Sequence, residues 1–247
     1  MPNVLKLSRE SWRWTLHLVE TVLLVAVSAS MLWWIFWGPQ SDRSRQAASR
    51  QRPAGALPAQ PISLKGTWPA GDIGAPVVVV VYSDYECPAC RKAAEGALPA
   101  LKRDFVNTGQ VQIVYKHLPL VRIHPFAMGA AIAAECAGAQ GQFWAMHESL
   151  ILGPLELDIA SLQRRARLFG LRAREFGDCL DGESVKKTVE EETRIATRIG
   201  IDRTPVFIVG LLQRDRTVNA IKRIDGVGAY EDLRTAVGDV LAGVSGR

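Results

Sequence analysis

The pattern of hydrophobic and polar positions predicts a strand, a helix and a second strand at the start of a globular region. Val77–Tyr82 is an unbroken apolar run, as expected for a central strand that is covered on both faces. In Val111–His117 apolar residues alternate with polar ones, which indicates a second strand. The segment between them predicts a helix from Cys87 to about Phe105, kinked or broken near Pro99. A strand, a crossover helix and a second strand form a right-handed unit with parallel strands.

A block of helical pattern follows between Pro125 and Gly200, and two short strands and a closing helix come after it. The order of these elements predicts an α/β protein with a thioredoxin-like core and an inserted helical domain. The predicted segments are Phe126–Ala139, Gly141–Leu152, a helix capped by Asp158 and ended by Gly170, Glu183–Ile199, Val206–Val209, Val218–Asp225 and Tyr230–Leu241.

An apolar run of 17 residues, Thr21–Trp37, predicts a membrane-spanning helix near the start of the chain. The run extends to Leu16 if His17 and Glu20 lie near the membrane interface. Val27-Ser28-Ala29 resembles a signal-peptide cleavage site, but it falls inside the run, so an uncleaved signal anchor is favoured. Five tryptophans flank the run, as in the aromatic belts of membrane helices: Trp12, Trp14, Trp33, Trp34 and Trp37.

These patterns divide the chain into four parts. Residues 1–15 are a predicted cytoplasmic segment, 16–37 the signal anchor, 38–61 a flexible tether and 62–247 the folded domain, with the helical insertion at about 125–200. Positive charge on both sides of the anchor does not decide its orientation. Four cysteines behind an export signal indicate an oxidising compartment, so we expect the folded domain to lie outside the cytoplasm.

The positive charge of the chain does not indicate nucleic-acid binding. The formal net charge is +5, with a pI near 9.2. Much of the excess lies in the N-terminal segment and the predicted tether, and the folded domain has mixed charges without a stripe of interleaved basic and aromatic residues.

Cys87-Pro88-Ala89-Cys90 directly follows the first predicted strand, and a Cys-x-x-Cys at a strand-to-helix turn is typical of a redox pair. At the start of a helix, unpaired backbone N–H groups and the helix dipole favour the thiolate of Cys87. The thiolate is the form that attacks disulfides. Pro88 fits the first helical turn, where its missing N–H costs nothing. Cys90 lies one turn later, within disulfide reach.

Metal binding and a purely structural disulfide are the alternatives for this pair. A zinc site needs a second ligand pair with similar spacing, whereas Cys136 and Cys179 stand singly and far apart. We therefore predict neither a metal site nor a cofactor. A weaker alternative is a module that binds Cu(I) through Cys87 and Cys90.

Several separated motifs, in this order, resemble one protein family. They are Ser83-Asp84-Tyr85-Glu86-Cys87-Pro88-Ala89-Cys90, His117-Leu118-Pro119-Leu120 with His124-Pro125, Ala134-Glu135-Cys136-Ala137 with Gln142-Phe143-Trp144-Ala145-Met146-His147, and Gly200 followed by Thr204-Pro205-Val206-Phe207. Between about Gly74 and Val240 the chain resembles the DsbA-like, thioredoxin-fold thiol:disulfide oxidoreductases of bacterial cell envelopes.

The resemblance implies roles for the four cysteines and for Thr204-Pro205. Cys87 would be the exposed nucleophile and Cys90 the resolving cysteine. Cys136 and Cys179 would form a structural disulfide, with an electron relay between the two pairs as the alternative. The Thr204-Pro205 bond would be cis and would expose the Thr204 backbone to an extended substrate chain. The alternative is an ordinary trans proline at the start of a strand.

One position departs from the family pattern. Val81 stands six positions before Cys87, where many members carry a buried acidic residue, and Asp84 and Glu86 belong to the turn. A buried thiol without a nearby base keeps a raised pKa and resolves slowly. We interpret three histidines in the motifs as core residues: His117, His124 and His147.

The sequence thus predicts a membrane-anchored thiol:disulfide oxidoreductase, most simply a dithiol oxidase that introduces disulfides into exported proteins through Cys87 and Cys90. The resemblance implies a location in the bacterial inner membrane with the catalytic domain facing the periplasm. The expected partners are cysteine-containing exported proteins and a membrane redox protein, either a quinone-linked oxidase or a thiol-transferring reductase. A reductase, for example in cytochrome c assembly, an isomerase and a non-catalytic assembly module are the alternatives.

Overall fold

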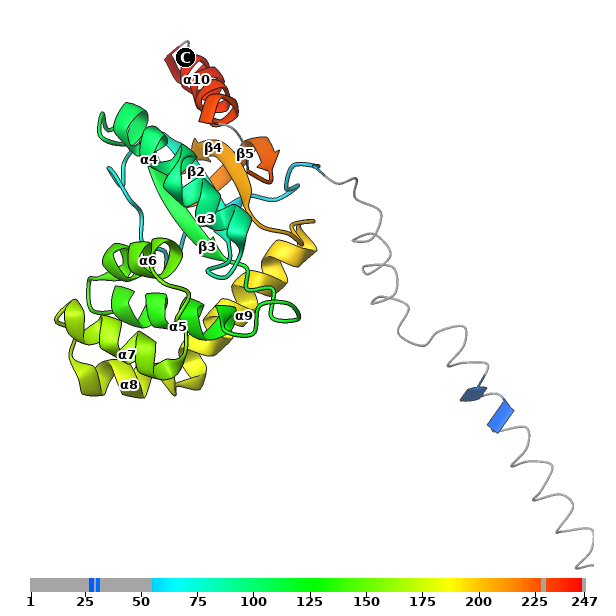
Figure 1. The fold of residues 1–247 in the computed structure, drawn as a ribbon. Helices are drawn as coiled ribbons and strands as arrows, with labels where there is room; N and C mark the ends of the chain where they lie inside the picture. The colour runs from blue at the N-terminus through cyan, green and yellow to red at the C-terminus, as the bar shows by residue number, and fades with distance from the viewer. Residues whose placement is uncertain (1–26, 29, 32–54, 228–229, 246–247) are drawn as a thin grey trace, which may run out of the picture. The chain divides into compact units, whose positions relative to one another are not determined.

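The structure of the protein is a computed structural model that describes residues 27–28, 30–31, 55–227 and 230–245 (Figure 1). The chain divides into two units, Met1–Gln51 and Arg52–Arg247, and the second holds all the strands described. Within the described residues, no helix is long and apolar enough to cross a membrane. Apart from residues 27, 28, 30 and 31, the predicted anchor at 16–37 lies outside them, as does most of the predicted tether.

A five-stranded mixed sheet forms the centre of the second unit (Figure 1). Its order is β1-β5-β4-β2-β3, in which β2 and β3 run parallel and the other neighbours are antiparallel. The parallel pair that the sequence predicted is therefore confirmed. The strands are β1 (Ile62–Ser63), β2 (Val77–Ser83), β3 (Val111–His117), β4 (Val206–Leu212) and β5 (Thr217–Asp225).

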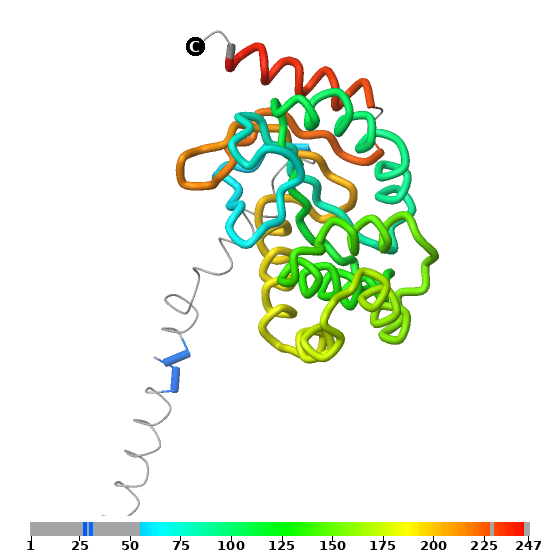
Figure 2. The backbone as a smooth tube through the Cα atoms, turned by 90° about the vertical axis from the view of Figure 1, so that its left-hand side faces the viewer, coloured from blue at the N-terminus to red at the C-terminus, as the bar shows by residue number. Residues whose placement is uncertain are grey.

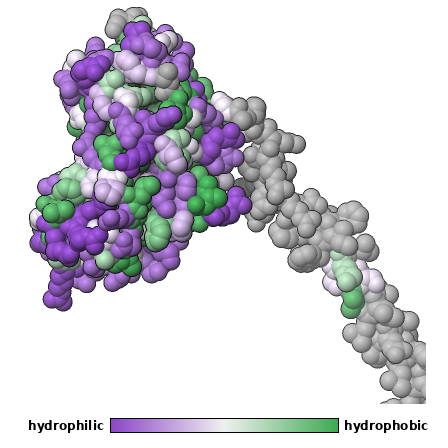
Figure 3. Space-filling view, in the orientation of Figure 1, coloured by the Kyte–Doolittle hydropathy of each residue, from purple (hydrophilic) through white to green (hydrophobic). Residues whose placement is uncertain are grey.

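β2 is buried on both faces of the sheet, as its unbroken apolar run predicted. Alternate residues point to opposite faces. Val77, Val79 and Val81 belong to one hydrophobic cluster, whereas Val78, Val80 and Tyr82 belong to another. The outer surface is different: on the face shown in Figure 3 it is mainly hydrophilic, with separate hydrophobic patches.

The crossover between β2 and β3 is a broken helix. It consists of α3 (Pro88–Glu95), α4 (Ala97–Leu101) and a π-helical turn, η1 (Lys102–Val106). The break lies at Gly96, with φ −115° and ψ −76°, three residues before Pro99, the position that the sequence suggested. Pro99 lies in the first turn of α4, where the backbone N–H groups have no partner in the helix, so proline is accommodated there.

A helical insertion follows β3, as the sequence predicted. It consists of five helices, of which α8 was not predicted as a separate helix. Asp158 caps α7 through a 3.1 Å hydrogen bond from the Ser161 N–H. The insertion and the closing helix α10 (Tyr230–Ser245) lie at opposite ends of the unit in Figures 1 and 2, and residues of α10, α5 and α6 belong to the same hydrophobic cluster. Its helices are α5 (Ala127–Gly138), α6 (Phe143–Leu152), α7 (Ile159–Leu168), α8 (Ala173–Leu180) and α9 (Glu183–Arg198).

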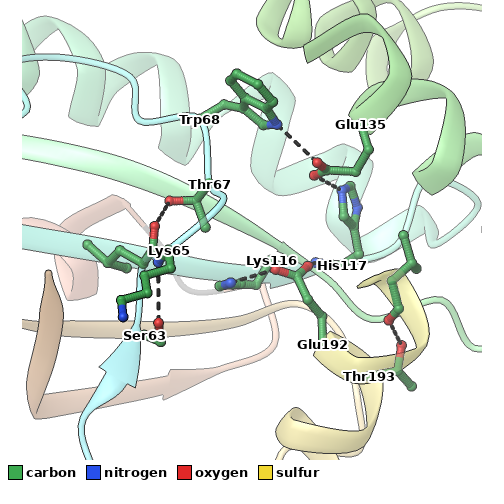
Figure 4. A network of polar contacts seen from close by, with 11 residues as sticks. Ser63, Lys65, Thr67, Trp68, Lys116, His117, Glu135, Glu192 and Thr193 are labelled. Atoms are coloured by element: carbon green, nitrogen blue, oxygen red, sulfur yellow. Dashed lines mark hydrogen bonds and ion pairs between the residues drawn. The ribbon is translucent and has the colours of Figure 1, made fainter. Parts of the chain in front are cut away.

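A network of largely buried polar contacts links the insertion to the end of β3 (Figure 4). Glu192 of α9 forms an ion pair with Lys116 and accepts a 2.9 Å hydrogen bond from the His117 backbone N–H. His117 also contacts Glu135 of α5 through its Nε2 at 3.0 Å, and the other oxygen of Glu135 accepts a hydrogen bond from the Trp68 indole. Charged groups on two helices are thus satisfied by groups on or beside the sheet.

We predict that Glu192→Ala destabilises the protein by about 3 kcal/mol, because it leaves the Lys116 ammonium buried without its partner. The Lys116 and Glu192 side chains are 10% and 13% exposed. Chemical denaturation of the purified full chain measures the change in the free energy of unfolding. Glu191→Ala is the matched control: Glu191 is the preceding residue of α9, its side chain is 40% exposed, and its ion pairs lie at the surface. A similar loss for both variants would contradict this prediction, since surface pairs contribute roughly 0–1 kcal/mol.

Candidate active site

The two cysteines of the Cys-x-x-Cys motif lie where β2 leads into α3. Cys87 is the residue before the first turn of α3 and has an extended backbone, with φ −73° and ψ 118°. Its side chain faces the N-terminal end of the helix, as the sequence predicted, and Cys90 lies one turn later. Cys87 is 8% exposed and Cys90 2% exposed, and both are free thiols. Cys87 is therefore the more accessible of the two residues, but it is buried and not exposed as the resemblance implied.

Thr204 and Pro205 face this pair from the other side. The peptide bond between them is cis. Pro205 precedes β4, whose first residue, Val206, pairs with Tyr82 near the end of β2. Sheet pairing therefore brings this loop to the start of α3, where the Sγ of Cys87 lies 3.6 Å from the carbonyl oxygen of Thr204.

The environments of the two sulfurs push their pKa values in opposite directions. The Cys90 thiol, followed by Thr204 and by backbone N–H groups of Cys90 and Ala89, stabilises the Cys87 thiolate and lowers the pKa of Cys87 to about 5, against the opposing effect of burial. Burial raises the pKa of Cys90, and its interaction with Cys87 raises it further, although Ser83 and Thr204 act against this. The arrangement therefore holds a thiolate on Cys87 beside a protonated Cys90 at neutral pH.

Asp84 and Glu86 tie the active-site turn to the loop after β3. The buried Asp84 carboxylate accepts hydrogen bonds from the Glu86 and Leu120 backbone N–H groups at 2.8 and 2.7 Å, and it contacts Nδ1 of His124 at 2.8 Å. Glu86 accepts a hydrogen bond from the Phe126 N–H at 2.6 Å. No pattern along the chain indicated these long-range contacts. The one feature of the sequence that pointed to a buried carboxylate is the position of Asp84 directly after the buried strand β2.

The three motif histidines all have polar partners. His117 contacts Glu135, His124 contacts Asp84, and Nδ1 of His147 lies 3.0 Å from the Tyr85 hydroxyl. Burial, aided by His117 and Lys102, lowers the pKa of His147 to about 3, so this imidazole is neutral. These contacts fit the interpretation of the histidines as core residues.

The remaining two cysteines lie away from the pair, in the helical insertion. Cys136 of α5 and Cys179 of α8 form a disulfide, with their Cα atoms 5.8 Å apart. It joins two helices of the insertion that are 43 residues apart in sequence. Among the residues that the structure describes, no three His, Cys, Asp or Glu side chains are grouped so that they could hold a metal ion.

A mixed sheet with a helical insertion, a Cys-x-x-Cys at the start of α3 and a cis-proline loop opposite it define a thioredoxin-fold protein with a dithiol site. The family model described as Thioredoxin matches residues 63–224. The chain belongs to the thioredoxin family, and its fold resembles that of solved DsbA-like proteins.

Individual relatives agree with this fold. The "Probable disulfide bond formation protein D" of Bacillus anthracis is 26% identical over 167 residues, which cover 63% of this chain and 75% of that protein. The structure of oxidised BdbD from Bacillus subtilis has a TM-score of 0.64 at 24% identity, covering 76% of this chain and 99% of that one.

A third relative is much longer than the present chain. The "Na(+)/H(+) antiporter NhaA 3" of Salinispora tropica is 38% identical over 135 residues. These residues make up 55% of this chain and 20% of that protein. The similarity therefore spans a fifth of its length, and the antiporter name belongs to the longer protein.

We predict that Cys87 of the reduced protein reacts with iodoacetamide at a rate that is nearly constant from about pH 8 down to about pH 6 and falls below about pH 5. The reason is that the thiolate is the reactive form, and the lowered pKa of about 5 keeps Cys87 ionised until the pH falls through that value. Mass spectrometry of the alkylated peptide measures the rate at each pH.

Cys90→Ala is the informative control, because the Cys90 thiol is the largest cause of the lowered Cys87 pKa. In this variant we expect the midpoint to move to higher pH. A wild-type midpoint near 8.5, the value of an unperturbed cysteine, would contradict the prediction.

Proposed function

We propose that the protein is a dithiol oxidase that introduces disulfides into exported proteins through Cys87 and Cys90. The observation that carries this proposal is the low Cys87 pKa of about 5 beside a raised Cys90 pKa. Stabilising the thiolate stabilises the reduced form of the enzyme, and a stable reduced form makes the oxidised form a good acceptor of electrons. Nucleophilic cysteines in related motifs range from about 7 in thioredoxin to about 3.5 in strong oxidants, and Cys87 falls between them.

The reaction consists of two exchanges at the more accessible sulfur. A substrate thiolate attacks the Sγ of Cys87 in the oxidised pair, the Cys87–Cys90 bond breaks, and Cys90 leaves and takes up a proton. A second substrate thiolate then attacks the substrate sulfur of the mixed disulfide and releases Cys87 as a thiolate. Two electrons pass to the enzyme and the substrate gains one disulfide. A leaving thiol with a low pKa departs faster, so the second exchange benefits from the environment of Cys87.

Thr204 and Pro205 are proposed to bind the substrate chain. The Thr204 carbonyl lies 3.6 Å from the Cys87 sulfur, so a peptide bonded to Cys87 would lie against this loop. An extended segment could pair there with the Thr204 backbone, in the manner of strand addition. Pro88 supports the site by opening α3, and Ala89 supports it by placing its backbone N–H beside the sulfur. The disulfide between Cys136 and Cys179 is proposed to be structural.

The cellular setting is proposed from the sequence. Residues 16–37 would anchor the protein in the bacterial inner membrane by one helix, with the catalytic domain facing the periplasm. Cysteine-containing exported proteins would be the substrates. A quinone-linked membrane protein would take the electrons from the reduced pair and return it to the disulfide form.

We predict that Cys87→Ser abolishes oxidation of reduced, unfolded ribonuclease by the oxidised enzyme. Cys90→Ser should instead accumulate a mixed disulfide with a small thiol or a substrate, because the resolving thiol is gone. The double variant Cys136→Ser/Cys179→Ser, assayed where it is folded, should keep its activity. Recovery of ribonuclease activity and non-reducing electrophoresis follow the two outcomes. An active Cys87→Ser variant, or a folded but inactive double variant, would contradict the assigned roles.

The direction of electron flow is tested by the reduction potential of the Cys87–Cys90 pair, measured against glutathione in the full chain. We expect a value between about −120 and about −200 mV, in the range of disulfide donors and isomerases. A value near about −270 mV, that of thioredoxin, would make the protein a reductase and would refute the oxidase role.

A further inference from the structure

Two buried side chains with hydroxyl groups, Ser83 and Tyr115, lie near Cys90 on the face of the sheet against which α3 packs. Ser83 is the last residue of β2 and is 4% exposed. Alternate residues of a strand point to the same face, so Ser83 shares a face with Val81, which belongs to the same hydrophobic cluster as Cys90. The Ser83 hydroxyl interacts with the Cys90 thiol. The proposed exchange reactions do not use this serine.

Tyr115 of β3 supplies the second hydroxyl group. It pairs with Val81 in the register of the two parallel strands, and it belongs to the same hydrophobic cluster as Val81 and Cys90. The hydroxyl of Tyr115 interacts with the Ser83 side chain, but it forms no full hydrogen bond with a described residue. Burial raises the pKa of Tyr115 well above its ordinary value, so the hydroxyl keeps its proton and is available as a donor.

The two hydroxyl groups lie beside Val81, the position at which this chain lacks a buried acidic residue. Burial is the main cause of the raised pKa of Cys90, and the Ser83 hydroxyl acts against it. When Cys90 leaves the disulfide, negative charge develops on its sulfur. A hydrogen bond from a hydroxyl to that charged sulfur is stronger than one to the neutral thiol, so it assists the departure of Cys90.

Other titratable side chains surround Cys90 and Tyr115, namely Cys87, Asp84, Tyr85, His117 and His147. The Asp84 carboxylate is held by two backbone N–H groups and His124. The Tyr85 hydroxyl lies 3.0 Å from Nδ1 of His147, and Nε2 of His117 lies 3.0 Å from a carboxylate oxygen of Glu135. These groups are therefore engaged with partners of their own.

Thr204 is the other hydroxyl-bearing residue at the site. It interacts with Cys87 as well as with Cys90, so a substitution there would disturb both sulfurs. Ser83 approaches the pair from the strand below Cys90 and therefore offers a way to change the environment of the resolving sulfur alone.

We propose that the Ser83 hydroxyl donates a hydrogen bond to the Cys90 sulfur while that sulfur carries negative charge, and that Tyr115 positions Ser83 by donating a hydrogen bond to its oxygen. Both hydroxyls keep their own protons throughout, and the proton that Cys90 takes up comes from the solvent. Because the charge develops on Cys90 whichever way the electrons flow, the proposal rests on the Cys87–Cys90 pair of the proposed function but not on its oxidase direction.

The test separates the two steps in which the reduced full chain reacts with excess oxidised glutathione. The Cys87 thiolate first attacks the glutathione disulfide, which forms a mixed disulfide and releases one glutathione thiolate. The Cys90 thiolate then attacks the Cys87 sulfur, which forms the Cys87–Cys90 disulfide and releases the second. Samples quenched in acid at intervals are analysed by mass spectrometry, which gives the rates of formation and of resolution at each pH.

Ser83→Ala and Tyr115→Phe should each slow the resolution step about three- to tenfold at a given pH. One hydrogen bond to a charged sulfur is lost, which shifts the rate profile to higher pH, while the higher pKa makes the sulfur somewhat more nucleophilic. The formation step depends on Cys87 and should keep its rate. The double variant should be little slower than Ser83→Ala, because Tyr115 acts through Ser83.

Two conservative variants are the matched controls. Ser83→Thr keeps the hydroxyl and should resolve the mixed disulfide like the wild type. Tyr82→Phe removes a hydroxyl from a tyrosine that is 1% exposed but belongs to the hydrophobic cluster on the other face of β2, so it should also resolve like the wild type. Thermal unfolding of each variant identifies those that fold, and a purely structural role would lower the unfolding temperature without slowing the resolution step alone.

An unchanged resolution rate in folded Ser83→Ala and Tyr115→Phe would overturn this proposal and leave the proposed function intact. Equal slowing by Tyr82→Phe, or equal slowing of both steps, would overturn it as well. If Cys87 of the wild type forms no mixed disulfide, the proposed dithiol function fails and this proposal fails with it. If one of the two hydroxyl variants does not fold, the other decides.

Discussion

The burial of β2 on both faces is the constraint on which the dithiol site depends. β2 lies between β3 and β4, so its length and direction are set by pairing on both edges. β2 ends at Ser83, so the start of α3 lies at the end of the sheet where β2 stops. The pairing of Tyr82 with Val206 brings Thr204 and Pro205 to the same end of the sheet. The Cys87 sulfur thus lies beside the carbonyl of Thr204, which is 117 residues away in sequence. Sheet pairing holds this loop in place, and no contact with the sulfur is needed for that.

The difference between the pKa values of the two sulfurs follows from how deeply each one is buried. Cys87 lies at the N-terminal end of α3, where backbone N–H groups and the Cys90 thiol stabilise its negative charge. Cys90 lies one turn deeper, where burial opposes a second charge. The pair behaves as a coupled acid, since a charge on one sulfur raises the pKa of the other. Pro88 and Ala89 between them supply helix geometry and backbone groups rather than charge.

Much of the fold could be predicted because the relevant patterns are local. The apolar run at Val77–Tyr82, the alternation at Val111–His117 and the capping residue Asp158 each depend on neighbours in sequence, and the structure confirms all three. The sequence predicted a break near Pro99, and the helix breaks at Gly96, three residues earlier, since the first turn of α4 tolerates proline. The first strand has two residues, too few to produce a periodic pattern.

The site was less predictable wherever it depends on distant residues. The motif itself indicated Cys87 and Cys90 as a redox pair, since the spacing and the preceding strand are both visible in the sequence. The contact of Asp84 with His124, and the ion pair of Lys116 with Glu192, join segments that are 40 and 76 residues apart. The interaction of Tyr115 with Ser83 is a property of the register between β2 and β3. No local periodicity encodes such a register.

Because Val81 stands where many family members carry a buried acidic residue, we expect one step of the exchange reaction to be slow. Attack on the Cys90 sulfur would expel Cys87, the better leaving group, but Cys90 is 2% exposed and Cys87 8% exposed, so access directs the attack to Cys87. Cys90 must then leave with a raised pKa, which slows its departure. The carboxylate of Asp84 is held by two backbone N–H groups and His124, and that of Glu135 by His117 and Trp68. With both acids engaged elsewhere and an apolar side chain at position 81, we expect formation of the mixed disulfide, rather than its release, to limit the rate.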